Sequence, residues 1–297
     1  MDAQKKEIRM NRRRFLSVCA MAGAFSAMPW VGIGASSAVP LHRWNGILLG
    51  AEVSLTLAHP DKHAANKIFA RCVSEIKRLE NIFTLYDAHS ELMQLNSNGI
   101  LQNPSPEILN IIAQSQRYHN MTDGAFDITV KPLEEGKSSD LIGMKKIHSS
   151  PKEIRLEKRG MAITLNGIAQ GYITDHVTEL LKNEGLSNVL VELGEKRTIG
   201  NHPSGRPWFL ALEGQGEPIS LSDKALATSA RHNPNNNAPH IYNPLDSQHA
   251  QAHNIVSVLA NSAAMADALS TGFMCLETEK VRHIQKQYSD IKNIYIS

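Results

Sequence analysis

Apolar side chains recur along much of this chain at steps of three and four residues, which predicts several amphipathic helices. The strongest helix is expected over residues 61–83, where one apolar stripe runs along the whole segment. A second helix is expected after Ser105 and Pro106, because a hydroxyl cap followed by proline is typical of a helix start. Further helices are predicted over residues 167–183, from Ser262 to about Leu276, and over residues 278–288.

Shorter apolar runs, some of them alternating with polar residues, predict strands between these helices. They are expected over residues 47–57, 188–193, 208–213, 255–260 and 293–296. Residues 84–98 and 232–253 are predicted as loops, and an Asp123-Gly124 turn is expected to lead into another strand. Because the elements mix without a regular βαβ repeat, the sequence predicts an α+β fold of mixed sheets and packed helices in one intertwined domain.

Composition places the chain among globular proteins, since 42% of its 297 residues are apolar and 20% are charged. The formal net charge of +2 is unevenly distributed. Residues 1–14 hold six basic groups and two acids, whereas residues 15–38 hold no charge. Residues 39–297 therefore carry a net charge of −2, and a basic nucleic-acid-binding protein is disfavoured.

The basic N-terminal segment and the residues after it follow the order of regions in an export signal. Residues 11–16 read Asn-Arg-Arg-Arg-Phe-Leu, an apolar stretch over residues 17–35 follows, and residues 35–38 are small. Paired arginines indicate the Tat route, so residues 1–38 are predicted to be a cleaved Tat signal and residues 39–297 the working domain in the periplasm. A membrane anchor is the alternative, but glycines and a proline interrupt the apolar stretch. A lipoprotein is not expected, because Val18 before Cys19 is bulky.

Two cysteines, Cys72 and Cys275, remain after the predicted cleavage. An oxidising compartment permits a disulfide between them. Both lie among apolar residues, however, and we expect two buried free thiols.

Asp267 and Thr271 are the first candidates for chemistry, because they are four residues apart on a predicted helix and face the same way. A carboxylate and a hydroxyl suit a hard cation such as Mg²⁺, although the same pair also fits an ordinary helix face. Gly167 and Gly171 open another predicted helix, where the main chain could approach a phosphate. Close helix packing explains these glycines equally well.

Small hydroxyl residues and a histidine form a further candidate set. Thr228 and Ser229 precede the Asn-rich loop, and His240 follows it, so the set could bind phosphate or move a proton. The histidines between residues 232 and 283 lack the spacing of a zinc site, and none is predicted.

Taken in order, these segments resemble the ApbE family of FAD:protein FMN transferases. The resemblance covers residues 44–276 and rests on several short motifs in sequence. These are Leu85-Tyr86 with Ser90-Glu91-Leu92 and Leu95-Asn96; Thr122 with Gly124-Ala125-Phe126-Asp127 and Thr129-Val130; Gly167-Ile168-Ala169-Gln170-Gly171-Tyr172 with Asp175; Ala227-Thr228-Ser229; His240-Ile241; and Ala266-Asp267-Ala268-Leu269-Ser270-Thr271.

The resemblance implies a substrate, FAD, a metal, Mg²⁺, and a reaction in which FMN moves to a threonine of a partner flavoprotein while AMP leaves. It implies that Asp267, Thr271 and the carbonyl of Ala169 bind Mg²⁺ and that His240 assists proton transfer. It also implies a set of residues that contact FAD, namely Tyr86, Asn96, Asp127, Gly167, Gln170, Thr228 and Ser229.

The Tat signal and the run over residues 165–175 make the chain most similar to the NosX-like branch. This similarity implies a periplasm-facing membrane flavoprotein resembling NosR as acceptor and the Tat translocon as export partner. The chain also departs from the family pattern. Gln170 stands where the family usually has lysine, Asn243 where it has aspartate, and the segment over residues 134–160 is short. The substitutions at positions 170 and 243 keep open the alternative of a non-catalytic flavin-binding accessory protein. A FAD diphosphatase, in which water replaces the threonine, is a further alternative.

Overall fold

The computed structural model describes residues 39–212, 217–233 and 237–297, so the predicted Tat signal lies outside the described residues. The helices are α2 (Lys62–Phe83), α3 (Glu91–Asn98), α4 (Pro106–Met121), α5 (Lys131–Glu134), α6 (Ala169–Asn183), α7 (Ala263–Phe273) and α8 (Thr278–Gln287). The strands are β1 (Leu41–Leu48), β2 (Ala51–Ala58), β3 (Ile100–Gln102), β4 (Ile147–Ser149), β5 (Glu153–Leu156), β6 (Val189–Leu193), β7 (Glu195–Ile199), β8 (Trp208–Leu210), β9 (Ile219–Leu221), β10 (Ala225–Ala230), β11 (Ile255–Ala260) and β12 (Ile291–Ile296).

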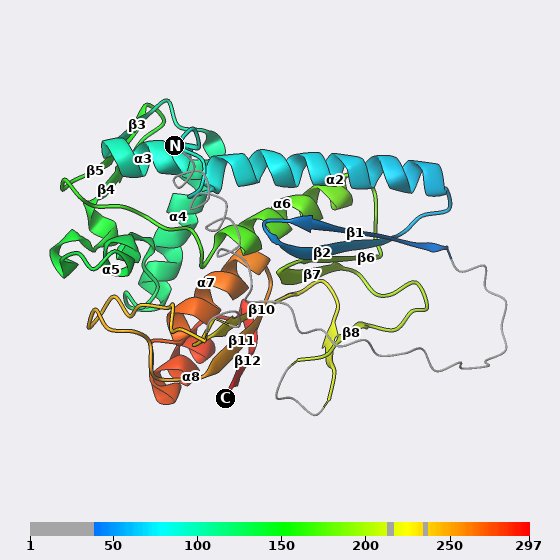
Figure 1. The fold of residues 1–297 in the computed structure, drawn as a ribbon. Helices are drawn as coiled ribbons and strands as arrows, with labels where there is room; N and C mark the ends of the chain where they lie inside the picture. Colours follow the sequence, from blue (N-terminus) through cyan, green and yellow to red (C-terminus); the bar gives the residue numbers. More distant parts are fainter. Residues whose placement is uncertain (1–38, 213–216, 234–236) are drawn as a thin grey trace.

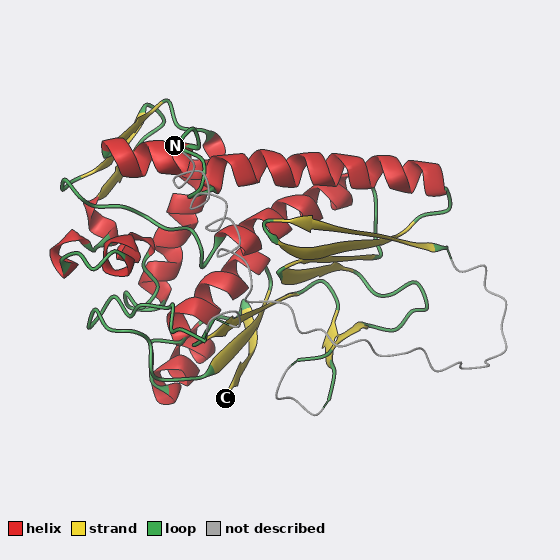
Figure 2. Ribbon diagram, in the orientation of Figure 1, coloured by secondary structure: helices red, strands yellow, loops and turns green. Residues whose placement is uncertain are grey.

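A seven-stranded antiparallel sheet in the order β1-β2-β6-β7-β10-β11-β12 organises these elements (Figure 1). Helix α6 packs on β6 and β7, while α7 packs on β10 and β11. Helix α2 contacts α6 and β1, and α3, α4 and α5 lie together near the small sheet β3-β5-β4 (Figure 2). Discrete helices beside antiparallel strands confirm the predicted α+β class.

The long helix α2 forms where the apolar stripe predicts it. The Asp61 side chain caps it by accepting hydrogen bonds from the main-chain N–H groups of His63 at 2.7 Å and Ala64 at 3.4 Å. The stripe is buried along its length and contributes to the main core. Its members are Ala65, Ile68, Phe69, Cys72, Ile76, Leu79 and Phe83.

The strand predicted over residues 47–57 is wrong, because a hairpin divides it. Leu49 and Gly50 adopt positive φ values of 51° and 66°, which turn the chain between β1 and β2. Leucine rarely adopts this conformation, so the continuous apolar run gives no sign of a turn.

Two further predictions are also wrong. Residues 84–98 are not all loop, because Ser90 caps α3 by accepting from the Met93 N–H at 3.0 Å. The Asp123-Gly124 turn leads into a short 3-10 helix, Ile128–Val130, rather than a strand. Asp127 causes this, since its carboxylate accepts a hydrogen bond from the Thr129 N–H at 2.7 Å and closes a helical turn.

The central sheet is covered by apolar residues on both faces. The strand predicted over residues 208–213 is a shorter β8, which pairs with β9 in a hairpin. That hairpin packs on the face opposite the helices, where one leucine each from β6, β10 and β11 joins it in a separate apolar cluster. The cluster consists of Leu190, Trp208, Leu210, Ile219, Leu221, Leu226 and Leu259.

Within the described part of the chain, no helix is long and apolar enough to cross a membrane. Cys72 and Cys275 are free thiols, the first buried and the second half-buried, which agrees with the expectation that they do not pair. Burial raises the pKa of each thiol to about 12.

Candidate functional site

The start of helix α6 crosses helix α7 at unusually short range. A Cβ atom at Gly171 would lie 2.3 Å from the main-chain oxygen of Ala263. The absence of a side chain lets the two main chains touch, and the Gly171 N–H reaches Asp267 Oδ2 at 2.9 Å. Close packing therefore accounts for this glycine, and the contact fixes one oxygen of Asp267.

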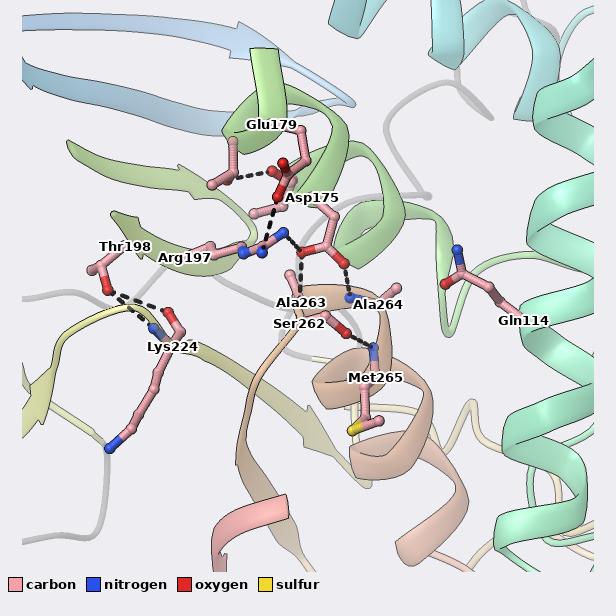
Figure 3. Close-up of polar contacts among 12 residues, drawn as sticks. Gln114, Asp175, Glu179, Arg197, Thr198, Lys224, Ser262, Ala263, Ala264 and Met265 are labelled. Atoms are coloured by element: carbon pink, nitrogen blue, oxygen red, sulfur yellow. Dashed lines mark hydrogen bonds and ion pairs between the residues drawn. The ribbon is translucent and has the colours of Figure 1, made fainter. Parts of the chain in front are cut away.

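Asp175 links helices α6 and α7 one turn further along α6 (Figure 3). Its carboxylate accepts hydrogen bonds from the N–H groups of Ala263 at 2.7 Å and Ala264 at 3.0 Å, which caps α7. Arg197 of β7 donates to Asp175 Oδ1 at 2.6 Å. Burial raises the pKa of Asp175, whereas Arg197 and the two N–H groups oppose that rise. The carboxylate joins α6, α7 and the sheet.

Asp267 is a buried carboxylate, and the hydrogen bond from the Gly171 N–H offsets only part of the cost of burying its charge. Burial raises its pKa to about 7, the hydrogen bond from Gly171 opposes the rise, and the nearby charge of Asp175 adds to it. Glu195, the first residue of β7, is also buried, and its pKa is raised well above the usual range by burial and by Asp267. Sequence reasoning assigned no role to Glu195; the only signal was an acid that directly follows an apolar strand and Gly194.

Hydroxyl groups of β10 and α7 meet beside Asp267. Ser229 Oγ lies 2.8 Å from Ser270 Oγ and 3.2 Å from Thr271 Oγ1. Thr228 instead faces its partner on the neighbouring strand β11, and its Oγ1 lies 2.8 Å from Ser257 Oγ. The Gly167 loop packs against Thr271, because a Cβ at Gly167 would lie 2.9 Å from Thr271 Oγ1. The prediction that Asp267 and Thr271 face the same way agrees with this arrangement.

A cavity of about 560 Å³ lies over this arrangement, a volume within the range of small-molecule sites. All predicted site residues except Asn96 line it. They are Tyr86, Asp127, Gly167, Ala169, Gln170, Thr228, Ser229, His240, Asp267 and Thr271. Separate segments of the chain thus converge on one space.

Asn96 lies beside this cavity rather than in it. Its side-chain amide donates to the Ile163 carbonyl at 2.8 Å and accepts from the Ile163 N–H at 2.7 Å. It borders an adjacent hollow of about 450 Å³ that also includes Tyr86. Asn96 therefore holds the main chain of Ile163 in place next to the cavity.

Two further groups of the cavity have shifted proton affinities. Burial raises the pKa of Asp127, although hydrogen bonds from Thr129 and the nearby His119 oppose the rise. His119 Nδ1 lies 3.5 Å from Asp127 Oδ2. Burial lowers the pKa of His240, so its imidazole is neutral at pH 7 and can accept a proton.

The charges of the cavity wall suit a cation. Among the described residues that line it are four carboxylates, from Asp127, Glu134, Glu195 and Asp267, and no lysine or arginine. Asp267 and Glu195 are buried near one another, which is unfavourable unless a proton or a cation is shared. A carboxylate, a hydroxyl and a main-chain carbonyl, supplied by Asp267, Thr271 and Ala169, are oxygen donors that Mg²⁺ accepts. The donor set fits this metal.

The fold and cavity define an α+β protein with an acidic, cation-suited pocket for a small molecule. The ApbE family model matches residues 49–295, and the chain belongs to the ApbE family.

Similar proteins agree with this assignment. The FAD:protein FMN transferase of Chlamydia pneumoniae is 27% identical over 63% of this chain, which spans 64% of that relative. The Chlamydia muridarum FAD:protein FMN transferase is 27% identical over 73% of this chain and 77% of its own length.

Two solved structures have the same fold. The Pseudomonas stutzeri flavinyl transferase ApbE in its apo form gives a TM-score of 0.74 at 22% identity, covering 83% of this chain and 87% of that one. The ApbE protein of Thermotoga maritima gives 0.75 at 24% identity, covering 86% and 94%.

Proposed function

We propose that this protein transfers the FMN half of FAD to a threonine hydroxyl of a partner flavoprotein and releases AMP. Relatives along most of the chain are FAD:protein FMN transferases. The observation that carries the proposal is the convergence of Asp267, Thr271, Ser229 and His240 on one cavity. Such a transfer needs little covalent chemistry from the protein and depends on positioning and charge neutralisation.

The reaction balances without a further reactant. The threonine oxygen of the acceptor forms a bond to the FMN phosphorus, and the bond from that phosphorus to the bridging oxygen of AMP breaks. AMP leaves with the bridging oxygen and its electron pair. The hydroxyl proton passes to a base, and the neutral imidazole of His240 is the cavity group suited to accept it.

Asp267, Thr271 and the Ala169 carbonyl would hold Mg²⁺, which when bound supplies a Lewis acid for the diphosphate. The residues around it determine how the substrate lies. Tyr86 offers a half-exposed ring at the cavity edge for the flavin or adenine, and the hydroxyls of Thr228 and Ser229 line the wall. Gly167 lets the wall come close to Thr271.

We further propose that the protein works in the periplasm after Tat export and belongs to the NosX-like branch. The twin-arginine head and the uncharged stretch after it support this placement. A periplasm-facing membrane flavoprotein resembling NosR is the acceptor that follows from it. A fractionation of cells carrying the full chain, with and without the paired arginines changed to lysine, tests the route.

A non-catalytic flavin-binding role is the second candidate, and the uncharged Gln170 in the cavity wall, at a position usually held by lysine, favours it. The other substituted position gives less support. Asn243 stands at a position usually held by aspartate, and it does not line the cavity. Its amide donates to Asp246 at 2.9 Å, and its oxygen accepts from the Leu245 N–H at 3.0 Å. The side chain therefore shapes its own loop.

The experiment incubates the purified protein with FAD, Mg²⁺ and a threonine-containing acceptor domain. Transfer yields AMP and a protein-bound flavin that stays fluorescent after denaturation. AMP with free FMN in the absence of acceptor identifies a FAD diphosphatase, and tight FAD binding without AMP identifies an accessory protein.

Two variants sharpen this assay. Asp267→Ala and Thr271→Val should each lower transfer at least about a hundredfold, because they remove cavity oxygens. Thr178→Val is the matched control, since the buried Thr178 hydroxyl donates to the Thr174 carbonyl at 2.7 Å outside the cavity. An Asp267→Ala variant that transfers FMN as fast as the wild type would contradict the metal assignment.

A further inference from the structure

A line of hydrogen bonds runs from the cavity wall into helix α7. Thr271 Oγ1 lies 3.2 Å from Ser229 Oγ, which lies 2.8 Å from Ser270 Oγ. The Ser270 hydroxyl in turn donates to the main-chain carbonyl oxygen of Asp267 at 3.0 Å. Thr271 and Ser229 line the cavity, whereas Ser270 is fully buried behind them. The line therefore connects two groups of the cavity wall with a carbonyl inside the helix.

The direction of every proton in this line follows from its last member. A carbonyl oxygen accepts and cannot donate, so the single hydroxyl proton of Ser270 points to Asp267. Ser270 Oγ can then only accept from Ser229, whose own proton is used in that bond. The contact between Ser229 and Thr271 therefore needs the proton of Thr271. Only this arrangement of protons satisfies all three contacts.

This arrangement determines what the Thr271 hydroxyl offers to the cavity. Its proton points to Ser229, so the oxygen presents lone pairs to its other directions. The Gly167 loop packs closely there, since a Cβ at Gly167 would lie 2.9 Å from Thr271 Oγ1. A hard cation binds oxygen lone pairs and is repelled by a hydroxyl proton. The line thus sets Thr271 as an acceptor before any ligand arrives.

Removing the end of the line would reverse it. Without the Ser270 hydroxyl, the Ser229 proton loses its acceptor and turns to Thr271 Oγ1, the other oxygen within hydrogen-bond distance. The Thr271 proton must then turn to the cavity side, where Asp267 stands one helical turn away on the same face of α7. A hydroxyl that donates to this carboxylate occupies the lone pairs that a cation needs.

We propose that Ser229 and Ser270 are positioning residues that hold the Thr271 hydroxyl in the orientation that binds a divalent cation. The proposal rests on the proposed function for the assignment of Asp267 and Thr271 as cation ligands. Ser270 acts from outside the cavity, through two hydrogen bonds and without contact to the ligand. Groups that orient metal ligands in this way contribute strongly to metal affinity.

Binding of the metal alone tests this assignment. Mn²⁺ binding to the full chain without FAD is measured by electron paramagnetic resonance of the free ion, and Mg²⁺ binding by competition. Ser270→Ala should weaken both about tenfold or more, and Ser229→Ala should have an effect of similar size. Ser115→Ala is the matched control, because the fully buried Ser115 hydroxyl donates to the Ile111 carbonyl at 2.7 Å within α4 and does not line the cavity.

A double-variant cycle separates orientation from packing. In a Thr271→Val background, adding Ser270→Ala should change Mn²⁺ affinity by less than about twofold, because the hydroxyl that Ser270 orients is already gone. A packing defect would instead weaken binding by the same factor with and without that hydroxyl. Thermal unfolding of each variant, recorded without metal, shows that the proteins compared are folded.

The outcomes separate this proposal from the proposed function. Wild-type metal affinity in Ser270→Ala would overturn the assignment, as would equal losses in both Thr271 backgrounds or a wild type that binds neither ion. A loss that requires the Thr271 hydroxyl supports it. If the wild type binds Mn²⁺ in this way but releases no AMP from FAD, FMN transfer fails while the orientation of Thr271 stands. If Ser270→Ala keeps full metal affinity while the wild type transfers FMN, only the orientation fails.

Discussion

Gly171→Ala probes a main-chain contact that borders the cavity. The added Cβ would lie 2.3 Å from the Ala263 oxygen, 2.6 Å from its carbonyl carbon and 2.8 Å from the Ala264 Cα. All three are main-chain atoms, so no side chain can rotate away. Real Cβ atoms almost never approach closer than 3.0 Å, and α6 must therefore move from α7 by about 0.7 Å.

The expected cost follows from two opposing effects. Overpacking of a tight contact costs about 1–3 kcal/mol, and the upper end applies where only main chain can move. Alanine favours a helix over glycine by about 1 kcal/mol. The net loss should be about 2 kcal/mol, which corresponds to a fall of roughly 4–8 °C in Tm for a domain of this size.

The substitution should also affect ligand binding, because the shift breaks the 2.9 Å hydrogen bond from the Gly171 N–H to Asp267 Oδ2. Thermal unfolding with and without FAD and MgCl₂ measures both effects. The wild type should be stabilised by the ligands, and Gly171→Ala should lose most of that stabilisation.

Gly99→Ala is the matched control. Gly99 ends α3 with φ of 72°, and a Cβ added there would meet no other atom within 4 Å, so alanine costs about 1 kcal/mol through conformation alone. This variant should keep the full ligand-induced rise in Tm. A Gly171→Ala protein that unfolds at or above the wild-type temperature would refute the reasoning from the helix crossing.

Three further predictions concern residues around the site. The thiols of Cys72 and Cys275, whose pKa values burial raises to about 12, should not react with a disulfide reagent at about pH 8 until the protein unfolds. Asn96→Ala should lower the unfolding free energy by about 2 kcal/mol, measured in urea, because it leaves two main-chain groups unpaired. Asp175→Asn should cost about 2 kcal/mol in the same assay, since it removes a partly buried ion pair and weakens a helix cap.

Each of these has a clear contrary outcome. Labelling of one folded thiol as fast as in urea would contradict the burial argument. An Asn96→Ala protein that keeps its stability and loses only FAD affinity would restore a direct ligand role. Asp175→Asn with wild-type stability would mean that the α7 cap does not hold the helices together.

The sequence predicted individual elements best where local signals were strong. The apolar stripe and Asp61 cap determine α2, and Ser262 determines the start of α7. Local signals failed where tertiary contacts decide. Strands β7 and β10 were not predicted, because β7 carries Lys196 and Arg197 in its interior and β10 consists largely of small residues. Pairing in the centre of a sheet overrides their weak propensity.

The candidate site residues come mainly from the family resemblance rather than from physical reasoning about the sequence. Spacing alone placed Asp267 and Thr271 on one helix face, but only the resemblance brought in Tyr86 and Asp127. No local rule could show that Glu195 is buried against Asp267, since that contact depends on how β7 meets α7. Nor does sequence show that Asn96 bonds main chain rather than facing the cavity.

The cavity is assembled from segments that lie far apart along the chain. Gly171 and Asp267 are 96 positions apart, and Ser229 and Thr271 are 42 apart. Forming contacts of such separation costs loop-closure entropy, which the rest of the fold must offset. Within the described residues, no short stretch of the polypeptide contains all the groups that line the cavity, so a molecule bound there would stabilise the completed fold over every partly folded state. Occupancy of the cavity would thereby report that folding has finished.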